Sequence, residues 1–179
     1  ADGRVFVEQT KDHFDLIMLD LTDPFGPAET LYGVEFLQQC KKVLSKKGVL
    51  SIHLGSPVTR PTLYARLLAS LRTVFSIVRP YLVYCPLYGT WWGMATASDQ
   101  IDPIAFSKDE VENRINSHNL KDLQFYNSAT HFGVFSLPNF VIDIGGGDAV
   151  PVSAQHPLHE DGLDPREHEP VKVIRTVQK

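Results

Sequence analysis

Apolar and polar positions follow one another along the first hundred residues in patterns that predict strands and helices in turn. Residues 15–20 form an apolar run between two carboxylates, which is typical of a strand buried on both faces of a parallel sheet. Residues 34–45 and 61–75 carry apolar side chains at intervals of three and four, which predicts two amphipathic helices. Gly48 stops the first helix and Pro61 starts the second.

Three further apolar runs, residues 49–54, 77–84 and 91–97, predict strands. The last two are joined by residues 86–90, a connection too short for a crossover helix, so we expect them to be antiparallel. The order strand, helix, strand, helix, strand, strand predicts an α/β protein with a parallel sheet closed by an antiparallel last strand. This pattern is typical of the second half of a nucleotide-binding fold.

The character of the chain changes twice after this sheet. Residues 1–98 are predicted to form half of a catalytic domain, and residues 99–144 a helical and strand extension that packs on it. Ser107 is expected to cap a helix in that extension. Residues 145–179 are rich in glycine, proline and charge, so we expect a tail that packs poorly on its own.

Composition narrows the class of protein. The 179 residues are 43% hydrophobic and 21% charged, which is enough to build a core, and the formal net charge of −4 argues against a nucleic-acid partner. Cys40 and Cys85 form neither a disulfide framework nor a C-x-x-C pair, so we expect a reducing compartment, the cytoplasm. The chain has no apolar run of ~18 residues, so no membrane span is expected.

The densest chemical signal follows the first strand. Asp20 ends the strand and Asp23 comes three residues later in a proline-containing loop. Two neighbouring carboxylates repel each other unless a cation or a proton lies between them, which favours a site for a positively charged ligand. Aspartates also begin turns and cap helices, so the spacing alone leaves a structural interpretation open.

The loop and its surroundings resemble the polyamine aminopropyltransferases, the spermidine synthase family. The similar segments are Asp20-Leu21-Thr22-Asp23-Pro24-Phe25-Gly26-Pro27-Ala28-Glu29, Leu31-Tyr32, Glu35-Phe36, Val43-Leu44, Lys47-Gly48-Val49-Leu50, Pro86-Leu87-Tyr88, Tyr126-Asn127, His131 and Phe135-x-Leu137-Pro138. The resemblance covers about residues 1–142 and implies a Rossmann-like class I methyltransferase fold. It also implies a transferase that moves the aminopropyl group of decarboxylated S-adenosylmethionine to putrescine or a longer polyamine, releasing methylthioadenosine.

The resemblance assigns roles around the amine. Asp23 matches the catalytic acidic residue of the family, and Asp20 matches the residue that orients the reacting amine. Tyr88 matches a tyrosine near the amine, and His53 stands where many members have a glutamine. Chemistry agrees with a carboxylate there, because an amine with a pKa near ~10 arrives protonated and must lose a proton before it attacks.

The co-substrate side is assigned in the same way. Asp2-Gly3 matches the family's Asp-Gly that binds adenine, and Pro27-Ala28 would line the adenine side of the loop. The resemblance implies no permanently bound cofactor and no metal, because the sulfonium of decarboxylated S-adenosylmethionine is already a good leaving group. It also implies a homodimer.

Departures from the family pattern leave the acceptor amine open. Leu21-Thr22 replaces the common Ser-Ser pair, and His53 replaces the glutamine. Two alternatives to the aminopropyltransferase remain: a methyltransferase of the same fold that acts on another nucleophile, and a non-catalytic interaction domain that kept the scaffold.

Overall fold

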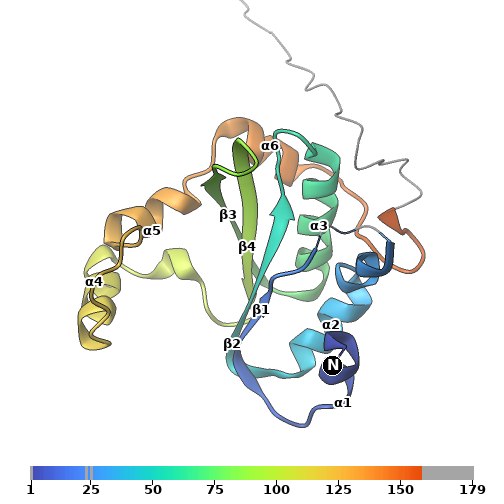
Figure 1. Ribbon diagram of the computed structural model, residues 1–179, viewed down its shortest axis with the longest axis horizontal. Helices are drawn as coiled ribbons and strands as arrows, with labels where there is room; N and C mark the ends of the chain where they lie inside the picture. The colour runs from blue at the N-terminus through green and yellow to red at the C-terminus, as the bar shows by residue number, and fades with distance from the viewer. Residues whose placement is uncertain (1, 23, 25, 159–179) are drawn as a thin grey trace, which may run out of the picture.

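One mixed sheet organises the part of the chain that the computed structural model describes, which is residues 2–22, 24 and 26–158 (Figure 1). The strands lie in the order β1-β2-β4-β3. Their bounds are β1 Phe14–Leu19, β2 Leu44–Gly55, β3 Ile77–Cys85 and β4 Thr90–Ser98. β1 and β2 are parallel, and β4 is antiparallel to both of its neighbours, β2 and β3. The predicted α/β fold and antiparallel last strand are confirmed, and β4, which follows β3 in the sequence, lies between β2 and β3 in the sheet.

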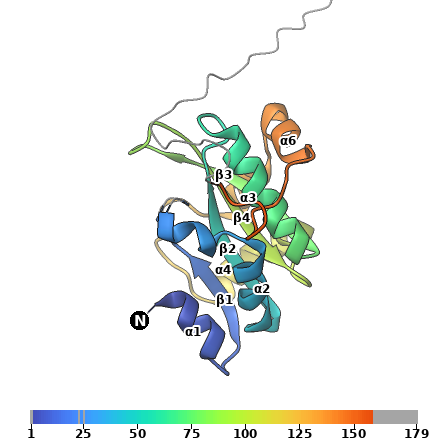
Figure 2. The ribbon, with the colours of Figure 1, turned by 90° about the vertical axis from the view of Figure 1, so that its right-hand side faces the viewer.

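Helices cover both sides of this sheet. In the described residues the α-helices are α1 Gly3–Gln9, α2 Val34–Lys42, α3 Pro61–Val74, α4 Lys108–Ser117, α5 Ser128–Phe135 and α6 Asn139–Gly146, and 3-10 turns span Gly26–Leu31 and Pro103–Ala105. Figures 1 and 2 show α2, α3 and α6 on one side of the sheet, with α4 and α5 on the other. Among the described residues, no helix has the length and apolar character needed to cross a membrane.

The core lies between the sheet and the α2–α3 layer. Every second residue of β2 faces this layer, and Leu50, Ile52 and Leu54 are at most 2% exposed. The apolar positions predicted for the helix at 61–75 are the buried face of α3. Gly93 of β4 lets the sheet approach this helix closely, since a Cβ there would lie 2.5 Å from the Tyr64 ring.

The boundary between α2 and β2 differs from the prediction. The helix expected at residues 34–45 ends at Lys42, and β2 begins at Leu44. The N–H of Phe14 donates to the carbonyl of Val43 at 2.9 Å, which draws the chain into parallel pairing with β1. Helix α1 was not predicted at all.

Residues 148–158 correct the expectation of a poorly packing tail. Val152 is 2% exposed and Leu158 is fully buried in the core. We call residues 148–158 the strap, because they run from the end of α6 past α3 to α2 (Figure 2). Residues 159–179 lie outside the described residues, and the division of the chain at residues 98 and 144 stays a prediction.

Candidate functional site

A cleft of about 630 Å³ opens on the sheet face opposite the α2–α3 layer. The alternation of β2 and β4 creates it, because the residues between the buried core positions point to this other face. The cleft is lined by Met18, Leu19, Asp20, Leu21, Thr22, Ser51, His53, Tyr81, Cys85, Tyr88, Trp92 and Met94. Ligands of open α/β sheets bind beyond the carboxyl ends of the strands, and this cleft reaches the end of β1.

Three of the predicted amine-site residues meet in this cleft. Asp20 directly follows β1 and is exposed to solvent, so its carboxylate can meet a charged ligand. His53 of β2 and Tyr88 of the β3–β4 turn line the same cleft. Asp23 lies outside the described residues, so its role as the base stays a prediction.

We call residues 20–23 the acidic loop, and His53 contacts this loop through one ring nitrogen. Its Nε2 lies 2.9 Å from the carbonyl oxygen of Leu21 and 2.7 Å from the hydroxyl of Tyr32. Because a carbonyl only accepts, Nε2 must carry the proton. The Tyr32 hydroxyl in turn donates to the carbonyl of Thr22 at 2.6 Å. Nδ1 of His53 is buried and has no hydrogen-bond partner among the described residues.

Aromatic rings form one wall of the cleft. The Trp92 ring stacks on the His53 ring with centroids 6.0 Å apart. The centroids of the Trp92 and Tyr88 rings are 4.6 Å apart. Such rings attract ammonium groups through their electron-rich faces and pack against methylene chains. The Asp20 carboxylate and this wall together suit a flexible, positively charged amine.

Sequence reasoning missed Tyr32 and Trp92 as site residues. Tyr32 was noted only as part of the family pattern, yet its side chain is 1% exposed and its hydroxyl bonds to the loop. Trp92 could have been found from the period of two in β4, which places Trp92 and Met94 on one face and Gly93 and Ala95 on the other.

A second cavity of about 260 Å³ lies between α1 and β1, and Gly3 lines it together with apolar side chains. Leu19 and Leu21 line both this cavity and the cleft, so the two are neighbours. The Asp2 side chain accepts a hydrogen bond from the N–H of Arg4 and caps α1. The predicted adenine contact of Asp2 stays a prediction, and the neighbouring residue Gly3 places the cavity close to it.

The remaining two predicted co-substrate residues lie in the 3-10 turn Gly26–Leu31. Ala28 is half-buried there. The side chain of Pro27 lies outside what the structure describes. Their predicted contact with adenine stays a prediction.

Comparison with known proteins gives consistent matches. Residues 1–109 match the model of the spermine/spermidine synthase domain. The polyamine aminopropyltransferase of Nitrosomonas europaea is 48% identical over 176 residues, which cover 98% of this chain and 54% of that protein.

Two solved structures have the same fold. A spermidine synthase in complex with the transition state analogue AdoDATO superposes with a TM-score of 0.73 at 34% identity, over 82% of this chain and 49% of that one. The spermidine synthase of Thermotoga maritima gives a TM-score of 0.71 at 34% identity, over 82% and 48%. The chain thus spans about half the length of the relatives it matches. With its sheet, its cleft at the end of β1 and these matches, the chain belongs to the spermine/spermidine synthase family.

Proposed function

We propose that the full-length protein is a polyamine aminopropyltransferase that uses decarboxylated S-adenosylmethionine and putrescine or a longer polyamine. The observation that carries this proposal is the position of Asp20 at the carboxyl end of β1, in a cleft walled by aromatic rings. The names of the relatives support it, and so does the analogue bound to the similar spermidine synthase. The comparisons do not favour the methyltransferase or non-catalytic alternatives.

The proposed reaction is a direct displacement. The amine nitrogen forms a bond to the carbon beside the sulfonium, the bond from that carbon to sulfur breaks, and its electron pair stays on sulfur. Methylthioadenosine leaves, and the proton lost by nitrogen goes to Asp23. Because the protonated amine is unreactive, this proton transfer is essential to the attack.

Asp20 holds and orients the amine in this scheme. Its carboxylate is a charged acceptor that lines the cleft, and it attracts the positive charge of the amine. Tyr88 and Trp92 pack on the methylene chain and face its positive end. His53 is proposed to contact the amine through the edge and face of its ring, because its Nε2 proton already forms a hydrogen bond to the carbonyl of Leu21.

Asp2, Gly3, Pro27 and Ala28 are proposed to hold the adenosine part of the co-substrate. The apolar cavity lined by Gly3 supports this, because it adjoins the amine cleft through Leu19 and Leu21. A homodimeric assembly and a cytoplasmic location belong to the same proposal.

The test is the reaction itself in the full-length protein. Incubation with decarboxylated S-adenosylmethionine and a panel of amines is expected to release methylthioadenosine with putrescine, spermidine or both. Asp23→Asn is expected to lower kcat by about 100-fold or more, while binding of methylthioadenosine changes by less than about threefold. Absence of methylthioadenosine with every amine, from protein that binds AdoDATO, would contradict the proposal.

A further inference from the structure

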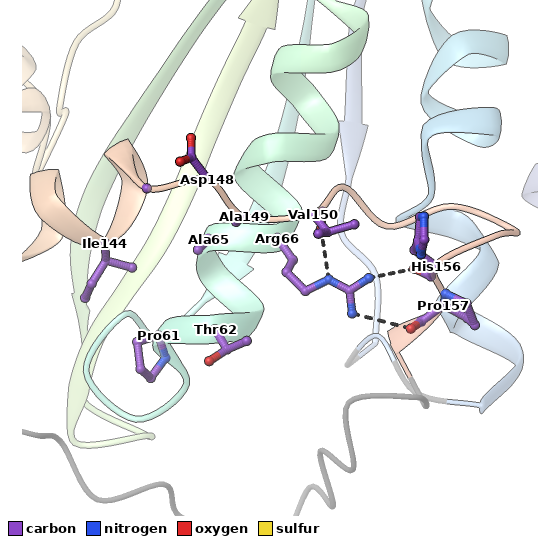
Figure 3. A pocket seen from close by; sticks show the side chains of 11 residues that line it. Pro61, Thr62, Ala65, Arg66, Ile144, Asp148, Ala149, Val150, His156 and Pro157 are labelled. Atoms are coloured by element: carbon purple, nitrogen blue, oxygen red, sulfur yellow. Dashed lines mark hydrogen bonds between the residues drawn. The ribbon is translucent and has the colours of Figure 1, made fainter.

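A buried arginine of α3 makes several hydrogen bonds to the strap. Arg66 is 6% exposed, and its guanidinium donates to three strap carbonyls (Figure 3). Its Nε lies 2.9 Å from the oxygen of Val150, Nη2 lies 2.6 Å from that of His156, and Nη1 lies 3.4 Å from that of Pro157. Charge-assisted hydrogen bonds of this kind are stronger than neutral ones, so the strap has a defined path across the helix.

Val152, in the middle of the strap, connects α3 to the start of α2. Its N–H donates to the hydroxyl of Ser70, a fully buried residue of α3, at 2.8 Å. Its carbonyl accepts the N–H of Val34, the first residue of α2, at 2.9 Å. Val34 has no earlier helical carbonyl to bond, so the strap completes the N-terminus of α2.

Two glutamates extend this connection on both sides of Tyr32. Glu35 accepts the N–H of Ala154 at 3.0 Å, and Glu29 accepts the N–H of Leu158. The N–H of Tyr32 donates to the carbonyl of Glu29 at 3.0 Å. The segment that carries Tyr32 is therefore fastened to the strap before and after it.

Tyr32 connects the segment 29–35 to the acidic loop through a hydrogen bond. Its hydroxyl donates to the carbonyl of Thr22, which lies between Asp20 and Asp23 in sequence. The described residues between Thr22 and Tyr32 include a short 3-10 turn that opens on Gly26 at a φ of 59°. Such turns are weakly stable by themselves, so the described loop residues Leu21 and Thr22 depend on contacts from elsewhere in the fold.

We infer that the strap is a positioning element for the amine site. By holding the segment 29–35 it holds Tyr32, and through Tyr32 it sets the backbone between Asp20, the predicted amine anchor, and Asp23, the predicted base. This inference rests on the proposed function. We expect loss of the strap contacts to lower kcat more than it raises KM. The reason is that a small displacement of a catalytic group slows the chemical step strongly while it changes substrate binding little.

Two arginines of α3 make a matched test in the full-length protein. Arg66→Met removes the donors to the strap, whereas Arg72→Met removes a donor to the carbonyl of Gly145, which lies in α6 before the strap begins. Arg66→Met is expected to lower kcat by about tenfold with KM for the amine changed by less than about threefold. Arg72→Met is expected to keep both values within about twofold.

An exposed residue provides a second variant in case Arg66→Met does not fold. Glu35→Ala removes the acceptor for Ala154 and leaves the core intact, since Glu35 is exposed. It is expected to lower kcat by about threefold in the same direction. Unchanged kcat in every folded variant of Arg66 and Glu35 would overturn the inference.

Tyr32→Phe separates positioning from general support of the core. If the strap acts through the Tyr32 hydroxyl, the effect of Arg66→Met on kcat shrinks to within about twofold in the Tyr32→Phe background. An equal factor in both backgrounds would show that the strap stabilises the fold without acting on the loop, and the inference would fail.

Hydrogen exchange measured by mass spectrometry gives a readout that needs no activity. Arg66→Met and Glu35→Ala are expected to speed amide exchange in residues 20–34 by about tenfold, and Arg72→Met is expected to leave it unchanged. If the enzyme makes no methylthioadenosine, the proposed function fails while this exchange result still decides the inference. Unchanged exchange in an active enzyme overturns the inference alone.

Discussion

The hydroxyl of Tyr32 lies 2.7 Å from Nε2 of His53, which joins the turn before α2 to strand β2 beside the acidic loop. Each of the two groups also bonds a loop carbonyl, Tyr32 that of Thr22 and His53 that of Leu21. The backbone between Asp20 and Asp23 is thereby held at two consecutive residues. His53, which the family resemblance places near the amine, therefore also holds the backbone of the acidic loop.

This arrangement leads to a prediction for His53→Gln. Since Nε2 of the native ring is bonded to Leu21 and Nδ1 is buried, we expect the substitution to lower kcat for putrescine and spermidine by a similar factor, about threefold to tenfold. Steady-state kinetics with both amines check this. A change in the ratio of kcat/KM between the amines would show instead that His53 selects the acceptor directly.

Asp20→Asn tests the anchor of the amine. Loss of the charge is expected to lower kcat/KM for the amine by about 100-fold, while binding of the product methylthioadenosine, which lacks the amine, stays within about threefold. Asp15→Asn is the matched control, because Asp15 lies at the other end of the same strand and bonds to Ser45. Equal losses in the two variants would remove Asp20 from the site.

Trp92→Leu tests the aromatic wall. The ring stacks on His53 and contacts Tyr88, so its removal is expected to raise KM for the amine by about tenfold. Trp91→Leu serves as the control, since Trp91 faces the other way, is 47% exposed and packs on Tyr84. Titration of the amine at saturating co-substrate measures the difference, and an unchanged KM in Trp92→Leu would contradict a role of the ring in binding.

The ion pair of Arg79 and Asp102 predicts a dependence of stability on pH. Hydrogen bonds from the Arg79 guanidinium, at 2.9 and 2.5 Å, hold the pKa of Asp102 below its usual range. A carboxylate with a lowered pKa stabilises the fold above its unfolded pKa of about 3.9, and this stabilisation is lost as the pH falls through the folded pKa.

Asp102→Asn is therefore expected to lower the free energy of unfolding by about 1 kcal/mol at pH 7 and by progressively less below about pH 4. Urea unfolding at several pH values measures the difference from wild type. The exposed Asp12→Asn is the control and should show no such convergence. A constant difference between Asp102→Asn and wild type down to pH 2 would refute the linkage.

Gly93→Ala is expected to destabilise the fold. The added methyl would lie 2.5 Å from the Tyr64 ring and 2.9 Å from the carbonyl of Gly55, so the helix must move away from the sheet, at a cost of about 1–3 kcal/mol. Gly133→Ala in α5 has open space around the new methyl and should be neutral or stabilising by up to about 1 kcal/mol. Thermal unfolding measures the midpoint temperature of both variants. Similar midpoints for Gly93→Ala and Gly133→Ala would show that α3 moves away from the sheet at little cost in stability.

Several features could be predicted from local sequence alone. The spacing of apolar residues in 61–75 predicted α3 because one helix face must be buried whatever it packs against. Ser107 and Glu110 form the capping box of α4, which needs only groups three residues apart. Asp20 at the end of an apolar run likewise identified the strand end at which the cleft opens.

Only the tertiary structure decided which of these elements meet. The position of β4 between β2 and β3, the path of residues 148–158 over Arg66 and the bond between Tyr32 and His53 each join residues that are far apart in the chain. A hydrophobic pattern records that a face is buried and not what buries it, because apolar contact has no direction. Buried polar groups find their hydrogen-bond partners only when the helices pack on the sheet. At this site Tyr32 and His53 become partners in this way, and both bond the acidic loop.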